Sequence, residues 1–260
     1  MLKEIKVLKS HGRQYVKNLR TQSVSDIFRG RPVISGDINR EEIEMVCALC
    51  PVQAISRESG SIDLGKCVFC KECSFAIPEK IKFTNDYRIA VNRRDDLLVH
   101  PGADTLLRLD EGTIRKVIRR VFRGSLKLRQ VSAGGDNSCE MELNAAGNVN
   151  FDAGRYGIDF VASPRHADGI VITGPVSENM SEALHICYDA VPEPKIIILA
   201  GTDAISGGIF TNGMANQENV PSGAIMREFI NRHHVDLYVP GNPLHPLTFI
   251  NGVMDLLGIK

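Results

Sequence analysis

Four cysteines place the strongest constraint on this 260-residue chain. Cys67, Cys70 and Cys73 are separated by two residues each, and Cys50 lies upstream, followed directly by Pro51. The tight spacing gathers three thiols on one short segment, and the remote Cys-Pro can supply a fourth ligand. Five of the seven cysteines fall in one short stretch, which indicates metal chemistry in a reducing compartment rather than a disulfide framework.

The spacing matches part of the bacterial ferredoxin run Cys-x-x-Cys-x-x-Cys-x-x-x-Cys-Pro, in which the fourth cysteine of each run ligates the cluster of the other run. Here the fourth position of the second run is Ile77. The first run keeps only its fourth cysteine, Cys50, and its other positions are Arg40, Ile43 and Val46. One crossed ligand set is complete and the other is absent. The sequence therefore predicts one [4Fe-4S] cluster, bound by Cys50, Cys67, Cys70 and Cys73.

Two alternative interpretations of these sulfurs stay open. Four buried cysteines can pack as small hydrophobic residues, and four thiolates also suit a tetrahedral zinc ion. Cys47 lies one residue past the expected ligand position at Val46. We interpret Cys47 as a packing residue.

Charge and hydropathy limit the kinds of partner. The 31 basic residues balance the 31 acidic ones, and apart from the N-terminal segment no basic stripe is interleaved with aromatic residues, so we expect no nucleic-acid partner. No apolar run approaches the roughly 20 residues that a membrane helix needs, and the N-terminus lacks a signal-peptide core. We expect a cytoplasmic protein with no direct membrane span.

The pattern of charge and apolar residues divides the chain into four parts. Residues 1–35 are basic and are predicted to form an arm that lies on a neighbouring surface or in solvent. Residues 36–100 hold the cysteines and are predicted to form the cluster domain. Residues 101–124 are predicted to be a linker helix, because apolar residues recur at helical spacing over 104–122. Residues 125–260 form the last part.

Residues 125–260 show the alternation of a parallel α/β sheet. Apolar runs at 169–174 and 195–201 end in glycine, and a helix is predicted between them over Glu178–Ala190. Further strands are predicted at 126–131, 158–162 and 235–241, with a closing helix over 247–257. In such sheets the functional edge lies beyond the carboxyl ends of the strands. The loops of interest therefore follow Val131, Thr173, Ala200 and Val239.

The sequence of these loops resembles the 20 kDa subunit family of complex I. The resemblance extends in particular to the small subunits of membrane-bound group 4 [NiFe]-hydrogenases, including those of formate hydrogenlyase. It rests on the segments 133–142, 155–158, 163–168, 173–176, 206–210 and 236–241. Residues 1–100 resemble the ferredoxin-type subunit that accompanies them, so the chain resembles a fusion of two subunits.

The resemblance implies an α/β fold in which a ferredoxin-like α+β [4Fe-4S] domain precedes a flavodoxin-like parallel-sheet domain. It implies an iron-sulfur electron-transfer subunit, with a docking α/β domain and no complete catalytic site of its own. Implied partners are a hydrogenase-like or complex I-like large subunit, membrane subunits and other iron-sulfur or redox subunits. Through them the protein would lie on the cytoplasmic face of the inner membrane.

One departure from the family concerns a second cluster. The resemblance implies four cysteines of a [4Fe-4S] cluster on these loops, and the matching positions here are Asp136, Cys139, Asp203 and Asn242. Oxygen and amide ligands do not favour this soft cluster, so we expect none at this site. A different metal at these residues stays open. Without a metal, Asp136 and Asp203 would need arginines or loop amides as partners, because a buried carboxylate without partners is costly.

Other polar groups are interpreted as structural. No serine or cysteine nucleophile motif accompanies the run 165–168, Arg-His-Ala-Asp, so a catalytic triad is not expected. His233, His234 and His245 are interpreted as loop histidines, not as a metal site. Glu140 and Glu142 are expected to be solvated or to pair with another subunit, rather than to relay protons.

Two other functions stay open at this stage. The chain could be a structural or redox-sensing assembly subunit without through-going electron transfer. Its α/β domain could also bind a small molecule or metal around Asp136, Cys139, Asp203 and Asn242.

Overall fold

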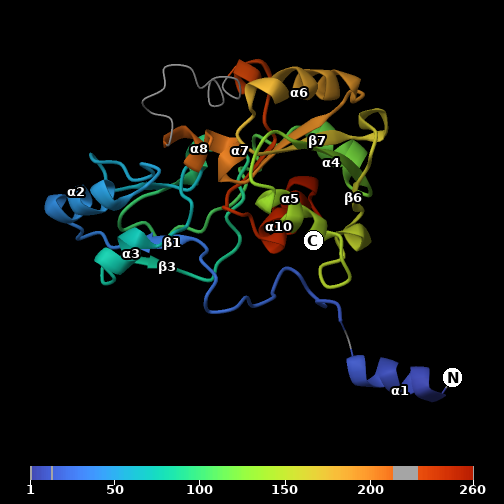
Figure 1. Ribbon diagram of the computed structural model, residues 1–260, viewed down its shortest axis with the longest axis horizontal. Coiled ribbons are helices and arrows are strands. Elements are labelled where there is room, and N and C mark those ends of the chain that lie inside the picture. The colour runs from blue at the N-terminus through green and yellow to red at the C-terminus, as the bar shows by residue number, and fades with distance from the viewer. Residues whose placement is uncertain (1, 13, 213–227, 260) are drawn as a thin grey trace.

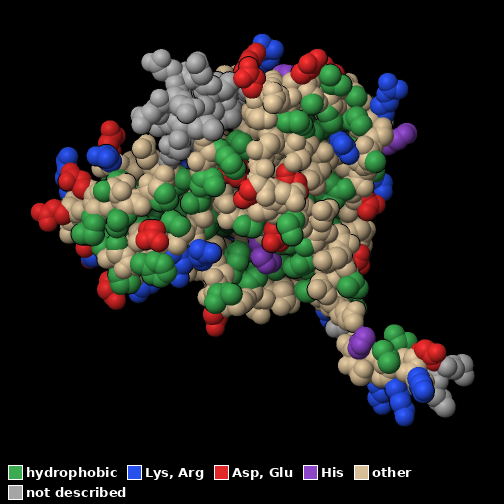
Figure 2. Space-filling model, in the orientation of Figure 1, with side chains coloured by type: hydrophobic (Ala, Val, Ile, Leu, Met, Phe, Trp, Pro, Cys, Tyr) green, Lys and Arg blue, Asp and Glu red, His purple; other side chains and the backbone are tan. Residues whose placement is uncertain are grey.

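The computed structural model describes residues 2–12, 14–212 and 228–259. Figure 1 shows a smaller part that carries the cysteines beside a larger part built on one sheet. Helix α1 (Leu2–His11) stands apart from both, and Figure 2 shows its basic side chains on the projecting segment. Among the described residues, no helix is long and apolar enough to cross a bilayer.

The chain that follows α1 lies against the larger part. Leu19 is fully buried, and its carbonyl oxygen accepts hydrogen bonds from the Tyr87 hydroxyl and from Asn251 Nδ2. Arg20 forms an ion pair with Asp255. The surface on which this segment lies therefore belongs to the same chain.

Short elements build the cysteine-bearing part. The antiparallel pairs are β1 (Pro32–Ile34) with β3 (Ile81–Phe83), and β2 (Ile62–Asp63) with β4 (Leu98–Val99). The helices are α2 (Arg40–Leu49), α3 (Glu72–Ala76) and the 3₁₀ turn η1 (Arg94–Leu97).

Specific residues define both ends of helix α2. Asn39 and Glu42 form a reciprocal capping box at its N-terminus, and this satisfies two backbone N–H groups. The helix ends at Leu49, and Cys50 follows it in an extended conformation, because the residue before Pro51 is disfavoured in the helical conformation. The sequence therefore places Cys50 at a fixed helix end.

The larger part is a five-stranded parallel sheet, as predicted for a flavodoxin-like fold. Its strand order is β6-β5-β7-β8-β9. The strands are β5 (Leu126–Ser132), β6 (Ile158–Phe160), β7 (Gly169–Thr173), β8 (Ile196–Ala200) and β9 (Leu237–Val239). Its helices are α4 (Lys116–Phe122), α5 (Ser138–Ala146), α6 (Glu178–Ala190), α7 (Thr202–Ser206), α8 (Ile209–Asn212) and α10 (Pro246–Leu257). The larger part also has two 3₁₀ turns, η2 (Ala153–Tyr156) and η3 (Pro164–His166).

Helices cover both faces of the sheet, so β7 and β8 are buried throughout. Side chains alternate between two cores: Ile170 and Ile172 face the core that includes Leu184 of α6, whereas Val171 faces the core of α5 and α10. The α6 core continues into the cysteine-bearing part. The two parts therefore share one hydrophobic core.

The predicted helix over 104–122 is only partly correct. The helix α4 begins at Lys116, and the preceding residues form irregular chain and turns. Asp110 Oδ1 accepts a hydrogen bond from Gly112 N–H, and Asn92 binds the backbone of Asp110. These local side-chain bonds compete with a helix, and Gly112 is a poor helix former.

Candidate metal centre

Cys50, Cys67, Cys70 and Cys73 come together around one small cavity. Cys50 lies at the end of α2, Cys67 and Cys70 lie in the loop before α3, and Cys73 is in α3. Phe69 has a positive φ angle of 54°, which few residues other than glycine adopt, and so the loop turns back between the thiols. The structure thus gathers all four predicted ligands. We call this group the four-cysteine site.

Backbone N–H groups point at two of the sulfurs. Ala54 N–H donates to Cys50 Sγ at 3.2 Å, and Phe69 N–H donates to Cys67 Sγ at 3.4 Å. Hydrogen bonds of this kind stabilise a thiolate more than a thiol. Burial acts in the opposite direction: it raises the pKa of Cys67 and raises that of Cys73 to about 11. A bound metal or cluster would stabilise the thiolate form of these buried cysteines, because metal ligands must be deprotonated. The four thiols therefore fit a metal or cluster as its ligands.

Cys47 is separate from the four-cysteine site. It is buried, and its Sγ donates to the carbonyl oxygen of Ile55 at 3.4 Å. It does not line the cavity. This contact supports its interpretation as a packing residue.

Four residues lie at the carboxyl edge of the sheet: Asp136 and Asn242 on loops, Cys139 in the first turn of α5, and Asp203 in the first turn of α7. Asn242 Nδ2 donates to Asp203 Oδ1 at 3.0 Å. Gly201 passes so close to Cys139 that a Cβ atom at Gly201 would lie 2.3 Å from the sulfur. The structure therefore brings these positions into one region, as predicted. We call this group the Asp203 site.

Both aspartates of the Asp203 site have amide or hydroxyl partners. Asp203 is 4% exposed and accepts from Asn242 and from the backbone of Ile209. Asp136 Oδ1 accepts from the N–H and the hydroxyl of Ser138 at 2.9 and 2.6 Å. Of the two predicted kinds of partner, loop amides rather than arginines are present in the described residues.

The Asp203 carboxyl gives the fold a pH dependence. Burial and the nearby charge of Asp136 raise its pKa from 3.8 to about 6. A carboxyl that binds its proton more tightly in the folded chain contributes its full stability below the unfolded pKa and loses it as pH rises through about 6. We expect Asp203→Asn to raise the free energy of unfolding by about 1–3 kcal/mol near pH 8 and to change it little near pH 4.

Urea unfolding of both chains at the two pH values measures this difference. An Asp203→Asn chain whose stability follows the same pH course as the parent would contradict the expectation.

The prediction that Glu140 is solvated is wrong. Glu140 is 5% exposed, and its Oε1 accepts from Ser132 Oγ at 2.6 Å and from Thr173 Oγ1 at 2.7 Å. The two hydroxyl donors come from neighbouring strands and compensate for the burial of the carboxyl group. Glu142 is half-buried, and burial raises its pKa.

A threonine that no sequence pattern indicated joins the two sites. Thr202 Oγ1 donates to the carbonyl oxygen of Cys67 at 2.9 Å, and the N–H of Gly241 donates to Thr202 Oγ1 at 3.4 Å. Thr202 is fully buried and directly precedes Asp203. The loop of the four-cysteine site is therefore tied to the loops of the Asp203 site.

The other polar candidates have structural partners. Asp168 Oδ2 accepts from the N–H of Lys127 at 2.6 Å at the start of a strand pair. His233 packs against Tyr188 and Phe229, whereas His245 lies elsewhere and caps α10 by accepting from Leu247 N–H. These contacts support the structural interpretation of these residues.

Comparison with known proteins places the chain in a family. Residues 137–256 match the family described as NADH ubiquinone oxidoreductase, 20 Kd subunit. A probable membrane-bound hydrogenase subunit, mbhJ, of Pyrococcus furiosus is 36% identical over 124 residues, which are 48% of this chain and 69% of the relative. An NADH-quinone oxidoreductase subunit of Clostridium beijerinckii is 39% identical over 119 residues, which are 45% of this chain and 65% of the relative.

A third relative is covered over most of its length. An uncharacterized protein of Methanocaldococcus jannaschii is 33% identical over 141 residues, which are 54% of this chain and 88% of the relative. The matched family segment contains Cys139, Asp203 and Asn242 of the Asp203 site, and Asp136 directly precedes it. The chain therefore belongs to the family of the NADH ubiquinone oxidoreductase 20 kDa subunit.

Proposed function

We propose that this protein is an iron-sulfur electron-transfer subunit of a membrane-associated oxidoreductase complex. Cys50, Cys67, Cys70 and Cys73 would hold one [4Fe-4S] cluster, which supplies one-electron chemistry when bound. The observation that carries the proposal is the convergence of four thiols from two chain segments on one cavity. Residues 36–100 would act as a ferredoxin-like domain, and residues 125–260 would dock against a large subunit.

The sequence spacing of the thiols supports a cluster over a single zinc ion. Three cysteines follow one another at intervals of three residues, and a remote Cys-Pro supplies the fourth thiol, as in the ligand runs of bacterial ferredoxins.

The protein's own residues would hold and tune this centre. Ala54 and Phe69 donate N–H groups to the sulfurs, and such bonds stabilise negative charge there and so adjust the reduction potential. Val52, Ile55 and Ile62 wall the cavity and exclude water. Thr202 fixes the Cys67 backbone against the sheet.

The α/β domain supports assembly with partners. The relatives are named as a membrane-bound hydrogenase subunit and as a subunit of NADH-quinone oxidoreductase. We propose that this chain likewise associates with a large subunit, membrane subunits and other redox subunits, on the cytoplasmic face of the inner membrane. The Asp203 site would carry no cluster, because three of its four side chains end in oxygen or amide groups.

Redox cycling of the anaerobically purified chain tests electron transfer. We expect an EPR signal to appear on reduction with dithionite, to vanish on addition of an oxidising dye, and to return on a second reduction with the iron retained. Loss of iron in the first cycle, or no signal after reduction, would contradict this function.

The second candidate is a structural or redox-sensing assembly subunit. The observation that favours it is the shared hydrophobic core, which makes the cysteine-bearing part integral to the fold of the larger part. In that case removal of the iron would prevent assembly of the complex, whereas a chain with a redox-inactive metal would still support it.

A further inference from the structure

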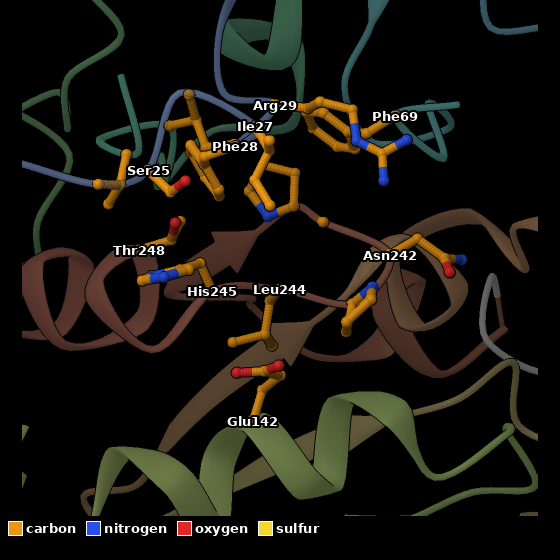
Figure 3. Close-up of a pocket in the computed structure, with 15 residues that line it drawn as sticks. Ser25, Ile27, Phe28, Arg29, Phe69, Glu142, Asn242, Leu244, His245 and Thr248 are labelled. Carbon is orange, nitrogen blue, oxygen red and sulfur yellow. The ribbon is translucent and has the colours of Figure 1, made fainter. Parts of the chain in front are cut away.

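A cavity of about 330 Å³ lies beside the two sites and has no role in the proposed function. The segment 24–29, the loop 240–245 and side chains from α5 and α10 form its walls, and Phe69 of the four-cysteine loop closes one side (Figure 3). Its volume is near the lower end of the range for small-molecule sites, which begins at about 300 Å³. The cavity can therefore hold a compact organic molecule.

A cation lies on another wall. Arg29 lines the cavity and is exposed, and it forms no ion pair or side-chain hydrogen bond with the described residues. Figure 3 shows its guanidinium group directed toward the cavity beside Phe69. A guanidinium group binds a carboxylate through two parallel hydrogen bonds.

The remaining walls favour an aromatic body. Phe28 and Phe69 are on the upper wall in Figure 3, with Leu244 opposite them. Phe28 also packs against His245, with ring centroids 5.1 Å apart. A planar ring can pack edge to face or offset against such side chains.

Glu142, the acidic residue of the cavity, is expected to repel a bound anion only weakly. In Figure 3 the side chain of Leu244 lies between Glu142 and the upper wall that carries Arg29. Burial raises the pKa of Glu142, which reduces its negative charge at a given pH.

We propose that this cavity binds a small aromatic carboxylate, with Arg29 on the carboxylate and with Phe28 and Phe69 on the ring. The site does not depend on the proposed electron-transfer function. A ligand here would lie against the loop of the four-cysteine site through Phe69.

Binding of 4-hydroxybenzoate to the anaerobically purified full-length chain tests the proposal. The control ligand is 4-hydroxybenzamide, an analogue of similar shape that carries no charge. Isothermal titration should show saturable binding of the acid and weaker binding of the amide. Arg29→Ala should weaken binding of the acid about 10- to 100-fold and leave that of the amide nearly unchanged. Arg40→Ala removes an exposed arginine on α2 and should change neither.

Equal affinity for acid and amide, unchanged affinity for the acid in Arg29→Ala, or no saturable binding would overturn the proposal. Because the readout is binding, its failure is distinct from a failure of redox cycling.

Discussion

Replacement of Cys70 by serine is expected to release the iron and to unfold much of the region 36–100. This region has strands of only two or three residues and helices of ten residues or fewer, so little regular secondary structure supports it. Binding of a metal centre to such a site contributes directly to folding. Iron content and the EPR signal should both fall to near background.

Hydrogen exchange locates the expected unfolding. Backbone amides in the region 36–100 should lose protection in Cys70→Ser, whereas those of β7 and β8 should keep most of theirs, since the sheet is buried between two layers of helices. Cys47→Ala is the control, because Cys47 lies outside the cavity and should leave iron content unchanged. Full iron content in Cys70→Ser would contradict the ligand assignment.

Arg115→Ala is expected to cause the largest loss of stability away from the four-cysteine site. Arg115 Nε and Nη2 bind the two oxygens of Asp236 at 2.8 Å each, and Nη2 also donates to the carbonyl oxygen of Lys195. The Asp236 side chain is 1% exposed and also accepts from Ile197 N–H. Removal of the guanidinium group leaves a buried carboxylate without its countercharge, at a cost of about 3–5 kcal/mol.

For a chain of this size the expected loss lowers the melting temperature by roughly 10 °C. Arg93→Ala provides the matched control: its ion pair with Asp110 joins side chains that are 50% and 36% exposed, and such a pair contributes about 1 kcal/mol or less. Calorimetry of the two variants measures the difference. Equal melting temperatures would show that the Arg115–Asp236 pair does not stabilise the fold.

Much of the larger part could be predicted from the sequence, because β7 and β8 are continuous apolar runs that are followed by glycine. The predicted helix Glu178–Ala190 is confirmed with the same bounds, and all five predicted strands occur in one parallel sheet. The predicted linker helix was too long, since the apolar periodicity over 104–122 carries no information on the Asn92–Asp110 bonds that form turns there.

The candidate sites could be predicted only where their residues follow a recognisable spacing in the sequence. Cysteine spacing identified the four thiols that line one cavity. No local pattern could reveal that Thr202 would bind the carbonyl oxygen of Cys67, because 135 residues separate them. The same limit explains the error at Glu140, whose partners Ser132 and Thr173 lie on strands that meet only in the folded sheet.

Iron, zinc and acid-labile sulfide content of the anaerobically purified, full-length chain is the most direct test of one cluster on Cys50, Cys67, Cys70 and Cys73. We expect about four irons and about four sulfides per chain, as for a single [4Fe-4S] cluster, with one EPR signal after reduction by dithionite. About eight irons would show that the Asp203 site also holds a cluster, and zinc without sulfide would contradict the assignment of the four-cysteine site.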